Sequence, residues 1–453
     1  MLETDLKAGT VIELHTDCVP PLPDGEELAT GDKAKQELFG QAPLEPGAAR
    51  KIKIILVLFG VSSLLPWNLI INAAGFYKVK LTGSRFETTF PFYLQISGVF
   101  SNLIGSFSMF FISKKLHPRT IFRIASFTFA VPILVITILS KINTDTWQDS
   151  FFLLNLVMFA INAFSHGTMT SSQSILTTMI NPGFLKVYYI GKGFAGLAGS
   201  AVAIVTLAVP SVDVVGAAFY YFLICTVVIL IGNTALTFYF LEIPEVRART
   251  CQGQKKEKYV EGDEEKEKIT DSGDMSLLEI TKSIKAMCGT VILLTIGSLF
   301  IFPATMTNLV PVNNKPETDW TEKFFLPIAV FLVFTIGDNA GKILSEYVTW
   351  PRKEWVVYFS IARLVLIPMV LMTNIQPRTL PVWFNTDVIP SLIAFVTAIT
   401  GGHLTNLALA YAPEYVHGKE NQGKASMIMF LCTAFGLTVG SACVFLVPVI
   451  LNS

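Results

Sequence analysis

The chain has 453 residues, of which 52% are hydrophobic and 15% are charged, and its 34 Lys and Arg balance 34 Asp and Glu. A soluble domain of this length needs far more charge on its surface, so the composition excludes an ordinary soluble protein. The six cysteines show no CxxC spacing, so neither a metal site nor a disulfide framework is expected.

The N-terminal segment, residues 1–49, is polar and rich in Pro, Gly and acidic side chains. It has no basic stretch followed by an apolar run, so it predicts a disordered tail rather than a signal peptide. Eleven apolar stretches follow, each near the roughly 20 residues that a helix needs to cross a bilayer. They lie at 52–76, 88–113, 119–141, 149–176, 187–210, 214–241, 285–311, 324–349, 355–373, 386–411 and 424–450. We therefore predict an all-α polytopic membrane protein with 11 transmembrane helices.

The charges outside the spans predict the orientation and the division of the chain. Lys and Arg gather in alternate loops, which places the N-terminus in the cytosol and, with an odd number of spans, the C-terminus outside the cell. The longest polar interruption, residues 243–283, is too charged to pack into a core. The expected organisation is a tail at 1–49, a six-helix bundle at 50–242, a cytosolic loop at 243–283 and a five-helix bundle at 284–453.

Two bundles joined by a long loop are typical of transporters that bind their substrate between the halves near the midplane. A receptor or structural membrane protein, with the loop as a simple tether, is the alternative. Ionisable residues inside the spans favour the transporter, because a charge at the bilayer centre costs roughly 2.5–3.5 kcal/mol. An enzyme is not expected, since no pairing of nucleophile and base emerges from the sequence.

The first span contains the sequence Leu64-Leu65-Pro66-Trp67-Asn68. Pro66 frees a backbone carbonyl and bends the helix within the membrane. Trp67 lies too deep for the interfacial belt, so it either stacks on a flat ring in a midplane cavity or packs in the core. The seventh span has a similar break at Phe302-Pro303.

The fourth and fifth spans combine polar residues with glycines. Residues 162–173 carry a polar stripe that indicates a cavity wall, with hydrogen bonding between helices as the alternative. In the fifth span, glycines at 191, 193, 196 and 199 allow helices to approach closely, and Lys192 is an unexpected charge among them.

Three charged residues occupy one face of the eighth span. Asp338, Lys342 and Glu346 are spaced four apart, so they share a face and cover about 12 Å of the helix axis. Such a stripe faces the bundle interior or a wet cavity rather than lipid. The order from Asp338 to Lys342 suits a helical ion pair, which either serves the substrate or clamps two helices.

Two more ionisable residues lie in the ninth and tenth spans. Arg363 is isolated among aliphatic residues and needs a carboxylate or carbonyl partner, for which Glu346 is a candidate. His403 is expected to be a hydrogen-bonded core residue, with a role in proton coupling as the alternative.

At these residues the chain resembles the equilibrative nucleoside transporters. The resemblance covers nearly every span and implies eleven spans in a major-facilitator-like 6+5 arrangement. It also implies facilitated movement of nucleosides, and in some members nucleobases, down a gradient. The elements that carry it are Leu64-Leu65-Pro66-Trp67-Asn68, Gly191-x-Gly193-x-Ala195-Gly196, Phe302-Pro303, Asp338-x-x-Gly341-Lys342, and Ala362-Arg363-Leu364-x-x-x-Pro368 with Asn374-x-x-Pro377-Arg378.

The resemblance further implies a substrate site. Members of the family hold the ribose with the Asp of the eighth span and the basic residue four positions on, here Asp338 and Lys342. They hold the base with the Trp of the first span, apolar neighbours and a Gln of the fourth span. The matching positions are Trp67, Leu64, Ile71 and Leu437, with Gln173 or Met169 in the fourth span. The residues then expected to gate the path or support the helices are Asn68, Pro66, Gly191, Phe302, Pro303, Glu346, Arg363 and His403.

The sequence departs from the family at Lys342, where Arg is usual and where Lys lacks the planar fork. The Asn-Gly that is usual in the tenth span is replaced by Gly401-Gly402. One alternative is a proton-coupled nucleoside, nucleobase or organic-cation carrier with Glu346, His166 or His403 as the titrating group. Another is a receptor or scaffold without transport. We expect a nucleoside or nucleobase substrate, a lipid bilayer around the protein, the plasma membrane as location, and neither a cofactor nor nucleic acid.

Overall fold

The computed structural model describes residues 44–87, 89–208, 214–251, 275–312, 318–443 and 446–452. Within these ranges ten helices are long and apolar enough to cross a membrane, and a shorter apolar helix, Val356–Leu371, lies at the ninth expected span. The predicted all-α polytopic membrane fold is therefore confirmed. Residues 1–43 of the expected tail lie outside the described ranges, and the first helix within those ranges begins at Pro46.

Six membrane-spanning elements precede the central loop. They are α3 (Pro46–Asn72), α5 (Phe90–Ile112), α6 (Pro118–Ser140), α7 (Gln148–Ile180), α8 (Phe184–Ala208) and α9 (Val214–Ile229), which continues through the π-helical turn Leu230–Ala235 into α10 (Leu236–Glu242). A short helix, α4 (Ala74–Lys80), follows α3.

The helices after the loop are more interrupted. They are α13 (Lys285–Phe300), the π-helical segment Trp320–Leu332 that continues as α14 (Val333–Tyr347), α15 (Val356–Ala362) and α16 (Leu366–Leu371) joined by the 3-10 turn Arg363–Val365, α17 (Val388–Tyr411), α18 (Lys419–Cys443) and the short α19 (Leu446–Leu451). The break expected at Phe302-Pro303 is confirmed, because Phe302 is non-helical with φ −131° and ψ 138°. Its ring stacks on that of Phe334, with centroids 3.8 Å apart.

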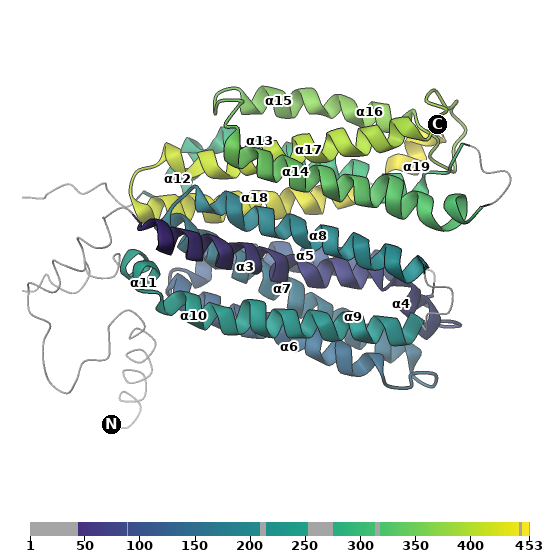
Figure 1. Ribbon diagram of the computed structural model, residues 1–453, viewed down its shortest axis with the longest axis horizontal. Helices are drawn as coiled ribbons and strands as arrows, with labels where there is room; N and C mark the ends of the chain where they lie inside the picture. Colours follow the sequence, from purple (N-terminus) through teal and green to yellow (C-terminus); the bar gives the residue numbers. More distant parts are fainter. Residues whose placement is uncertain are drawn as a thin grey trace, which may run out of the picture.

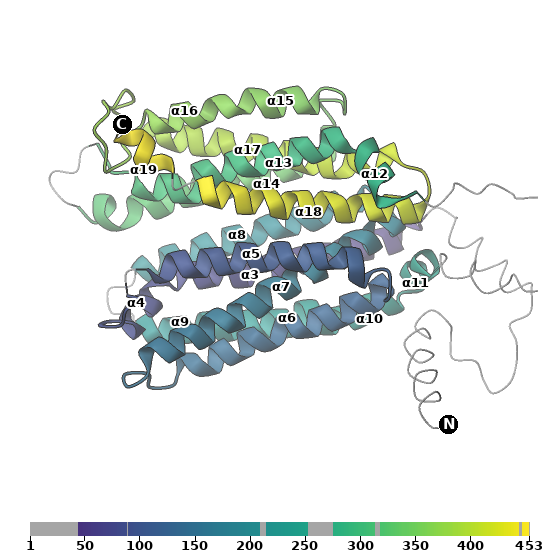
Figure 2. The same cartoon turned by 180° about the vertical axis from the view of Figure 1, so that it is seen from behind.

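The helices gather in two groups that follow the two parts of the sequence. Figure 1 shows α3 to α10, in purple to teal, lying together and α13 to α19, in green to yellow, lying together, and Figure 2 shows the same division from behind. Between the groups, α8 packs on α14, and α18 packs on α5 and α7. Because α11 (Pro244–Thr250) and α12 (Leu277–Ser283) lie at one end of the helices, we call this end the loop end.

The surface of the helices is more apolar, and their contacts more polar, than in a soluble protein. Large apolar side chains such as Phe111, Phe127 and Ile231 are well exposed on the outer faces of their helices. Hydroxyl groups lie buried between helices, for example Thr137 of α6 with Thr226 of α9, whose oxygens are 2.9 Å apart. Such a surface suits lipid, and hydroxyl pairs of this kind join helices in a membrane.

Two helix crossings depend on glycine. Gly191 of α8 lies so close to α3 that an added Cβ would stand 2.2 Å from the Val57 carbonyl oxygen. At Gly341 of α14 the same Cβ would stand 2.1 Å from the Ile399 carbonyl oxygen of α17. The close approach predicted for Gly191 is confirmed, and Gly341 fixes α14, with its charged residues, against α17.

The sequence predicts that the segment 243–283 is too charged to pack into a core, but both of its ends pack onto the bundle. The helix α11 (Pro244–Thr250) buries Val246 and Thr250, and α12 (Leu277–Ser283) buries Ile280. Apolar residues at these ends are enough to bring each short helix onto the bundle. The most charged stretch, residues 252–274, lies outside the described residues.

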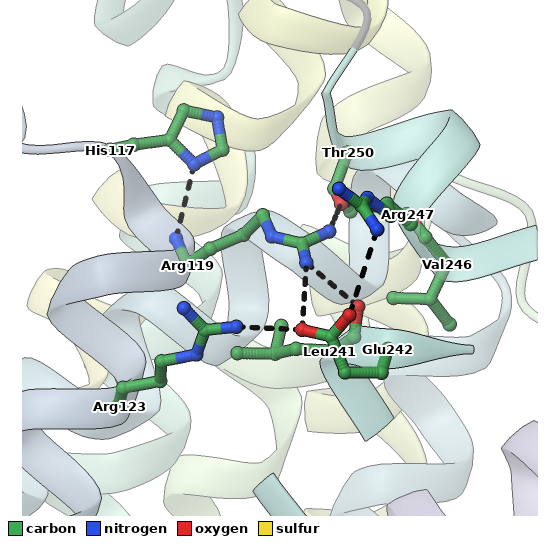
Figure 3. A network of polar contacts seen from close by, with 8 residues as sticks. All are labelled: His117, Arg119, Arg123, Leu241, Glu242, Val246, Arg247 and Thr250. Atoms are coloured by element: carbon green, nitrogen blue, oxygen red, sulfur yellow. Dashed lines mark hydrogen bonds and ion pairs between the residues drawn. The ribbon is translucent and has the colours of Figure 1, made fainter. Parts of the chain in front are cut away.

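Arginines at the start of α6 hold the corner between α10 and α11, as Figure 3 shows. The fully buried Arg119 donates to the Leu241 carbonyl (2.7 Å) and to the Thr250 hydroxyl (3.1 Å). Arg123 donates to the Glu242 carboxylate at 2.8 Å. These basic residues, which the sequence offers only as orientation signals, therefore also join α6 to the beginning of the central loop.

Candidate functional site

Asp338 and Lys342 form an ion pair on one face of α14, as the sequence predicts. Lys342 Nζ lies 2.5 Å from Asp338 Oδ2, and the two side chains are 13% and 25% exposed. A carboxylate only accepts hydrogen bonds and an ammonium only donates them. Within the described residues this one contact is the only hydrogen bond of either group, so Asp338 Oδ1 and two Lys342 hydrogens are available to a ligand.

Two successive glycines of α17 make room for the charges around α14. A Cβ on Gly402 would stand 2.5 Å from the Asp338 carbonyl oxygen and 3.0 Å from Oδ1. A Cβ on Gly401 would stand 2.7 Å from Arg363 Nη2. The pair Gly401-Gly402 thus lets a carboxylate and a guanidinium lie side by side against the same helix.

Arg363 is buried and makes four hydrogen bonds. Its Nε donates to Thr400 Oγ1 (3.0 Å) and its Nη1 to the Leu294 carbonyl (3.2 Å). Its Nη2 donates to Ser298 Oγ (2.7 Å) and to the Thr397 carbonyl (2.6 Å). Arg363 therefore joins its own turn to α13 and α17, which is a structural role.

The pairing of Arg363 with Glu346 offered by the sequence is wrong. Glu346 lies at the loop end of α14 and pairs with Lys53 of α3, with Nζ 3.3 Å from Oε1. Glu346 is about two turns beyond Asp338, so its carboxylate reaches the outer end of the bundle instead of the interior where Arg363 lies. The pair Lys53–Glu346 joins the two groups of helices at the loop end.

The two candidate titrating histidines both have hydrogen-bond partners. His403 Nε2 lies 2.7 Å from the Trp350 carbonyl oxygen, so this nitrogen carries the hydrogen, and the buried Nδ1 has no partner among the described residues. His166 Nδ1 lies 2.8 Å from Asn102 Oδ1, and its Nε2 lies 3.3 Å from Thr170 Oγ1. Both histidines are therefore hydrogen-bonded core residues, the role that the sequence predicts for His403.

Trp67 packs within the first group of helices. Its ring stacks on Phe159 of α7, with centroids 5.6 Å apart and planes at 27°. A Cβ on Gly98 of α5 would stand 2.3 Å from the Trp67 ring, so α5 also closes on this side chain. The ring is half-buried and lies in the opposite group of helices from Asp338.

The other candidates of α3 and α18 have fewer described contacts. Leu64 and Leu437 are half-buried on α3 and α18, and the side chain of Ile71 lies outside the described residues. Pro66 is buried inside a continuous α3. Asn68 donates from Nδ2 to the Leu64 carbonyl at 3.0 Å, which supports the helix around Trp67.

Gln173 and Met169, the two fourth-span candidates, have different surroundings. Met169 is fully buried, and its sulfur accepts a hydrogen bond from Asn233 Nδ2 (3.1 Å) inside the first group of helices. Gln173 is 1% exposed, and neither its Oε1 nor its Nε2 has a hydrogen-bond partner in the described residues. A buried amide without partners is costly, so Gln173 has the donors and the acceptor that a base requires.

Lys192 is the functional candidate that the sequence marked only as an oddity. It is buried on α8, and its ammonium lies 4.9 Å from the ring centroid of Tyr188, 5.1 Å from that of Tyr189 and 5.1 Å from that of Phe430. The signal that could have identified this arrangement is the spacing, because tyrosines three and four residues before a lysine share its helix face.

The charges around Asp338 are unbalanced. Asp338 is a single carboxylate, whereas Arg363 lies beside it against α17 and Lys342 is bonded to it. Lys192 lies within electrostatic reach of Lys342. Three cations around one carboxylate favour a ligand with hydrogen-bond acceptors and oppose a cationic one.

Comparison with known proteins identifies the relatives of this chain. A family model described as "Nucleoside transporter" matches residues 156–449. The rat protein named equilibrative nucleoside transporter 3 is 26% identical over 91% of this chain and 93% of its own length. The human equilibrative nucleoside transporter 1 is also 26% identical, over 88% of this chain and 96% of its own length.

Solved structures of low sequence identity share the fold. The human organic anion transporter MFSD10 superposes with a TM-score of 0.54 at 13% identity, covering 90% of this chain and 95% of that one. The major facilitator superfamily transporter FucP, in its outward conformation, gives 0.52 at 10% identity over 89% and 99% of the two chains. At this identity the likeness concerns the fold alone, which is the major-facilitator-like arrangement that the family resemblance implies.

Proposed function

This chain belongs to the nucleoside transporter family, and from that premise we propose that it carries nucleosides across a membrane down their concentration gradient. It is a multi-pass membrane protein and a transporter rather than an enzyme. The observation that carries the proposal is the partly exposed Asp338–Lys342 pair on α14. An ion pair within the membrane-spanning part of a protein is costly and marks a substrate path by default.

Asp338 and Lys342 hold the ribose in this proposal. Asp338 Oδ1 accepts hydrogen bonds from ribose hydroxyls, because a carboxylate is the natural acceptor for hydroxyl donors. Lys342 bonds the other carboxylate oxygen, Oδ2, and turns its remaining hydrogens toward ribose oxygens. Lys lacks the planar fork of Arg, so it holds the sugar through separate bonds instead of a bidentate pair.

Trp67 and Gln173 hold the base from the other group of helices. The half-buried Trp67 ring, backed by Phe159, offers a flat apolar surface for stacking. Gln173 satisfies its buried amide by bonding the polar edge of the base. Leu64, Ile71 and Leu437 complete the apolar wall, and a free nucleobase uses the same part of the site.

Alternating access follows if the two groups of helices rock about the substrate. Lys53–Glu346 and the bond from Lys186 Nζ to the Ser345 carbonyl (2.9 Å) join the groups at the loop end. Gln95 Nε2 and Ser441 Oγ, 3.2 Å apart, join them toward the other end. We propose that these contacts break alternately, in a plasma-membrane protein with a cytosolic N-terminus and an external C-terminus.

An uptake assay tests this proposal. The purified chain in liposomes should take up labelled adenosine and uridine, and hypoxanthine as a nucleobase, but not an organic cation, equally at pH 5.5 and 7.4. The inside concentration should end equal to the outside one. Accumulation above the outside level that a protonophore abolishes would instead support the proton-coupled carrier, and no uptake of any nucleoside would refute the proposal.

A further inference from the structure

Lys192 is a buried cation that the transport cycle proposed above leaves unused. Its side chain is 6% exposed and is surrounded by the rings of Tyr188, Tyr189 and Phe430. Tyr188 and Tyr189 belong to its own helix, α8, whereas Phe430 comes from α18 in the other group of helices. The ammonium therefore lies where the two groups meet.

The rings attract the charge of Lys192 but leave its hydrogens without acceptors. An ammonium has three N–H donors, and a ring face attracts a cation through its quadrupole. Within the described residues Lys192 has no carboxylate partner and donates no hydrogen bond. The Tyr188 hydroxyl is engaged with Ser63 Oγ and Thr170 Oγ1, both at 3.3 Å. The buried Tyr189 hydroxyl has no partner there either, so two neighbouring polar groups remain unsatisfied.

Lys192 lies at the depth of the proposed ribose contacts. The next residue, Gly193, packs so closely on α14 that an added Cβ would stand 2.5 Å from Asn339 Oδ1, beside Asp338. Eight residues separate Lys192 from the loop end of α8 at Phe184, and nine separate Asp338 from the end of α14 at Tyr347. At 1.5 Å per residue both charges lie about 12–14 Å from the ends of their helices.

Building on the proposed function, we propose that Lys192 donates a hydrogen bond to a carbonyl oxygen of the base and makes this carrier prefer oxo-bases to amino-bases. Inosine and adenosine differ at purine position 6, where one has a carbonyl acceptor and the other an amino donor. An ammonium donates a hydrogen bond to the carbonyl. It opposes the amino group, because the ammonium and the amino group are both donors and neither accepts a hydrogen bond from the other. A buried polar group left unpaired rejects the wrong substrate strongly.

Competition between substrates tests this preference. Unlabelled inosine and adenosine compete with labelled uridine for uptake into liposomes, and the ratio of their inhibitory concentrations is independent of the amount of protein. In the natural protein inosine should inhibit uridine uptake at a concentration about ten- to a hundredfold lower than adenosine does. This factor corresponds to the free energy of one hydrogen bond to a charged group. Lys192→Met, which keeps the apolar stem between the rings, should abolish the difference, and Lys192→Arg should keep it.

A matched control is Lys51→Met. Lys51 also lies over a tyrosine, 4.9 Å from the Tyr239 ring centroid, but it is exposed at the start of α3. This variant should keep the inosine preference of the natural protein. If the ratio is the same in the natural protein and in Lys192→Met, the rings and Lys192 are structural and the inference is wrong.

A second measurement applies if Lys192→Met does not fold. Inosine should raise the thermal unfolding temperature of the detergent-solubilised natural protein more than the same concentration of adenosine does. An equal or smaller rise overturns the role of Lys192 while leaving nucleoside binding intact. If neither nucleoside binds or enters, the proposed function itself fails.

Discussion

Arg363 and Lys192 are both buried cations of the membrane-spanning region, and their surroundings differ in one decisive respect. Arg363 makes four hydrogen bonds to α13, α17 and their side chains. Lys192 is held by three aromatic rings and, among the described residues, makes none. The role of a buried cation therefore depends on whether the protein supplies acceptors for its N–H groups.

The energies of the two arrangements separate them further. A hydrogen bond to a charged group contributes about 1.5–3 kcal/mol, so the bonds of Arg363 together exceed the attraction of rings for a cation, about 0.5–2 kcal/mol. Arg363 is thus satisfied by the protein alone. In the proposed cycle, Lys192, Asp338 and Lys342 complete their hydrogen bonds only when a ligand is present. Substitutions of the first kind should affect folding, and those of the second kind should affect transport.

The largest effect is expected at Arg363. Arg363→Met removes four hydrogen bonds from a charged donor, and a hydrogen bond to a charged group contributes about 1.5–3 kcal/mol. The variant should yield little folded protein and unfold at a clearly lower temperature in detergent, as followed by size-exclusion chromatography and a thermal scan. Arg352→Met, at an exposed arginine, is the matched control. An unfolding temperature like that of the natural protein would contradict the structural role of Arg363.

Asp338 should show the second-largest effect, and the opposite signature. Asp338→Asn keeps the shape but loses a charge-assisted hydrogen bond, so nucleoside affinity should fall about ten- to a hundredfold. The unfolding temperature should change little, because this side chain is partly exposed. The measurement is the concentration dependence of uridine uptake at matched protein amounts, with Asp145→Asn in an exposed turn as control. Normal uptake by Asp338→Asn would exclude a contact with substrate.

Trp67 should combine an effect on folding with an effect on transport, since its ring is packed on one face and half-exposed overall. A ring stack contributes about 0.5–1.5 kcal/mol beyond burial, so Trp67→Ala should weaken nucleoside binding about two- to twelvefold. Trp67→Phe should keep most of the affinity. The exposed Trp383 provides the control Trp383→Ala. Lower yield of Trp67→Ala with unchanged affinity would assign Trp67 to packing against Phe159.

Glu346 should show the smallest effect. Its pair with Lys53 lies at the loop end, where the side chains are 29% and 42% exposed, and such pairs contribute about 0–1 kcal/mol. Glu346→Gln should therefore change nucleoside affinity by less than about fivefold and leave the yield unchanged. A loss of transport as large as that of Asp338→Asn would show that Glu346 belongs with the ligand-dependent charges.

Patterns along single helices were predictable from the sequence. The apolar spans, the i,i+4 pair of Asp338 and Lys342, the break at Phe302 and the close approach at Gly191 all follow from local spacing. Each of these features depends on residues a few positions apart or on the size of one side chain. They required no knowledge of how the helices are arranged.

Partners from distant parts of the sequence were not predictable. The sequence offers Arg363 as a partner for Glu346 because both are charged and lie in adjacent spans, yet the partner of Glu346 is Lys53, 293 positions away. Arg363 instead uses carbonyls and hydroxyls, which carry no charge pattern in a sequence. The cage around Lys192 requires Phe430 from α18, and the burial of Arg119 requires the corner between α10 and α11.

Counterflow is the measurement that tests the central claim most directly, which is that this chain alone exchanges nucleosides across a membrane without a coupled ion. Liposomes containing the purified protein are loaded with unlabelled uridine and diluted into labelled uridine, with no sodium, proton or potassium gradient. The account predicts that label rises transiently above its outside concentration and then falls, and that Asp338→Asn loses this peak. Entry no faster than into protein-free liposomes, or a peak that appears only with an imposed proton gradient, would contradict it.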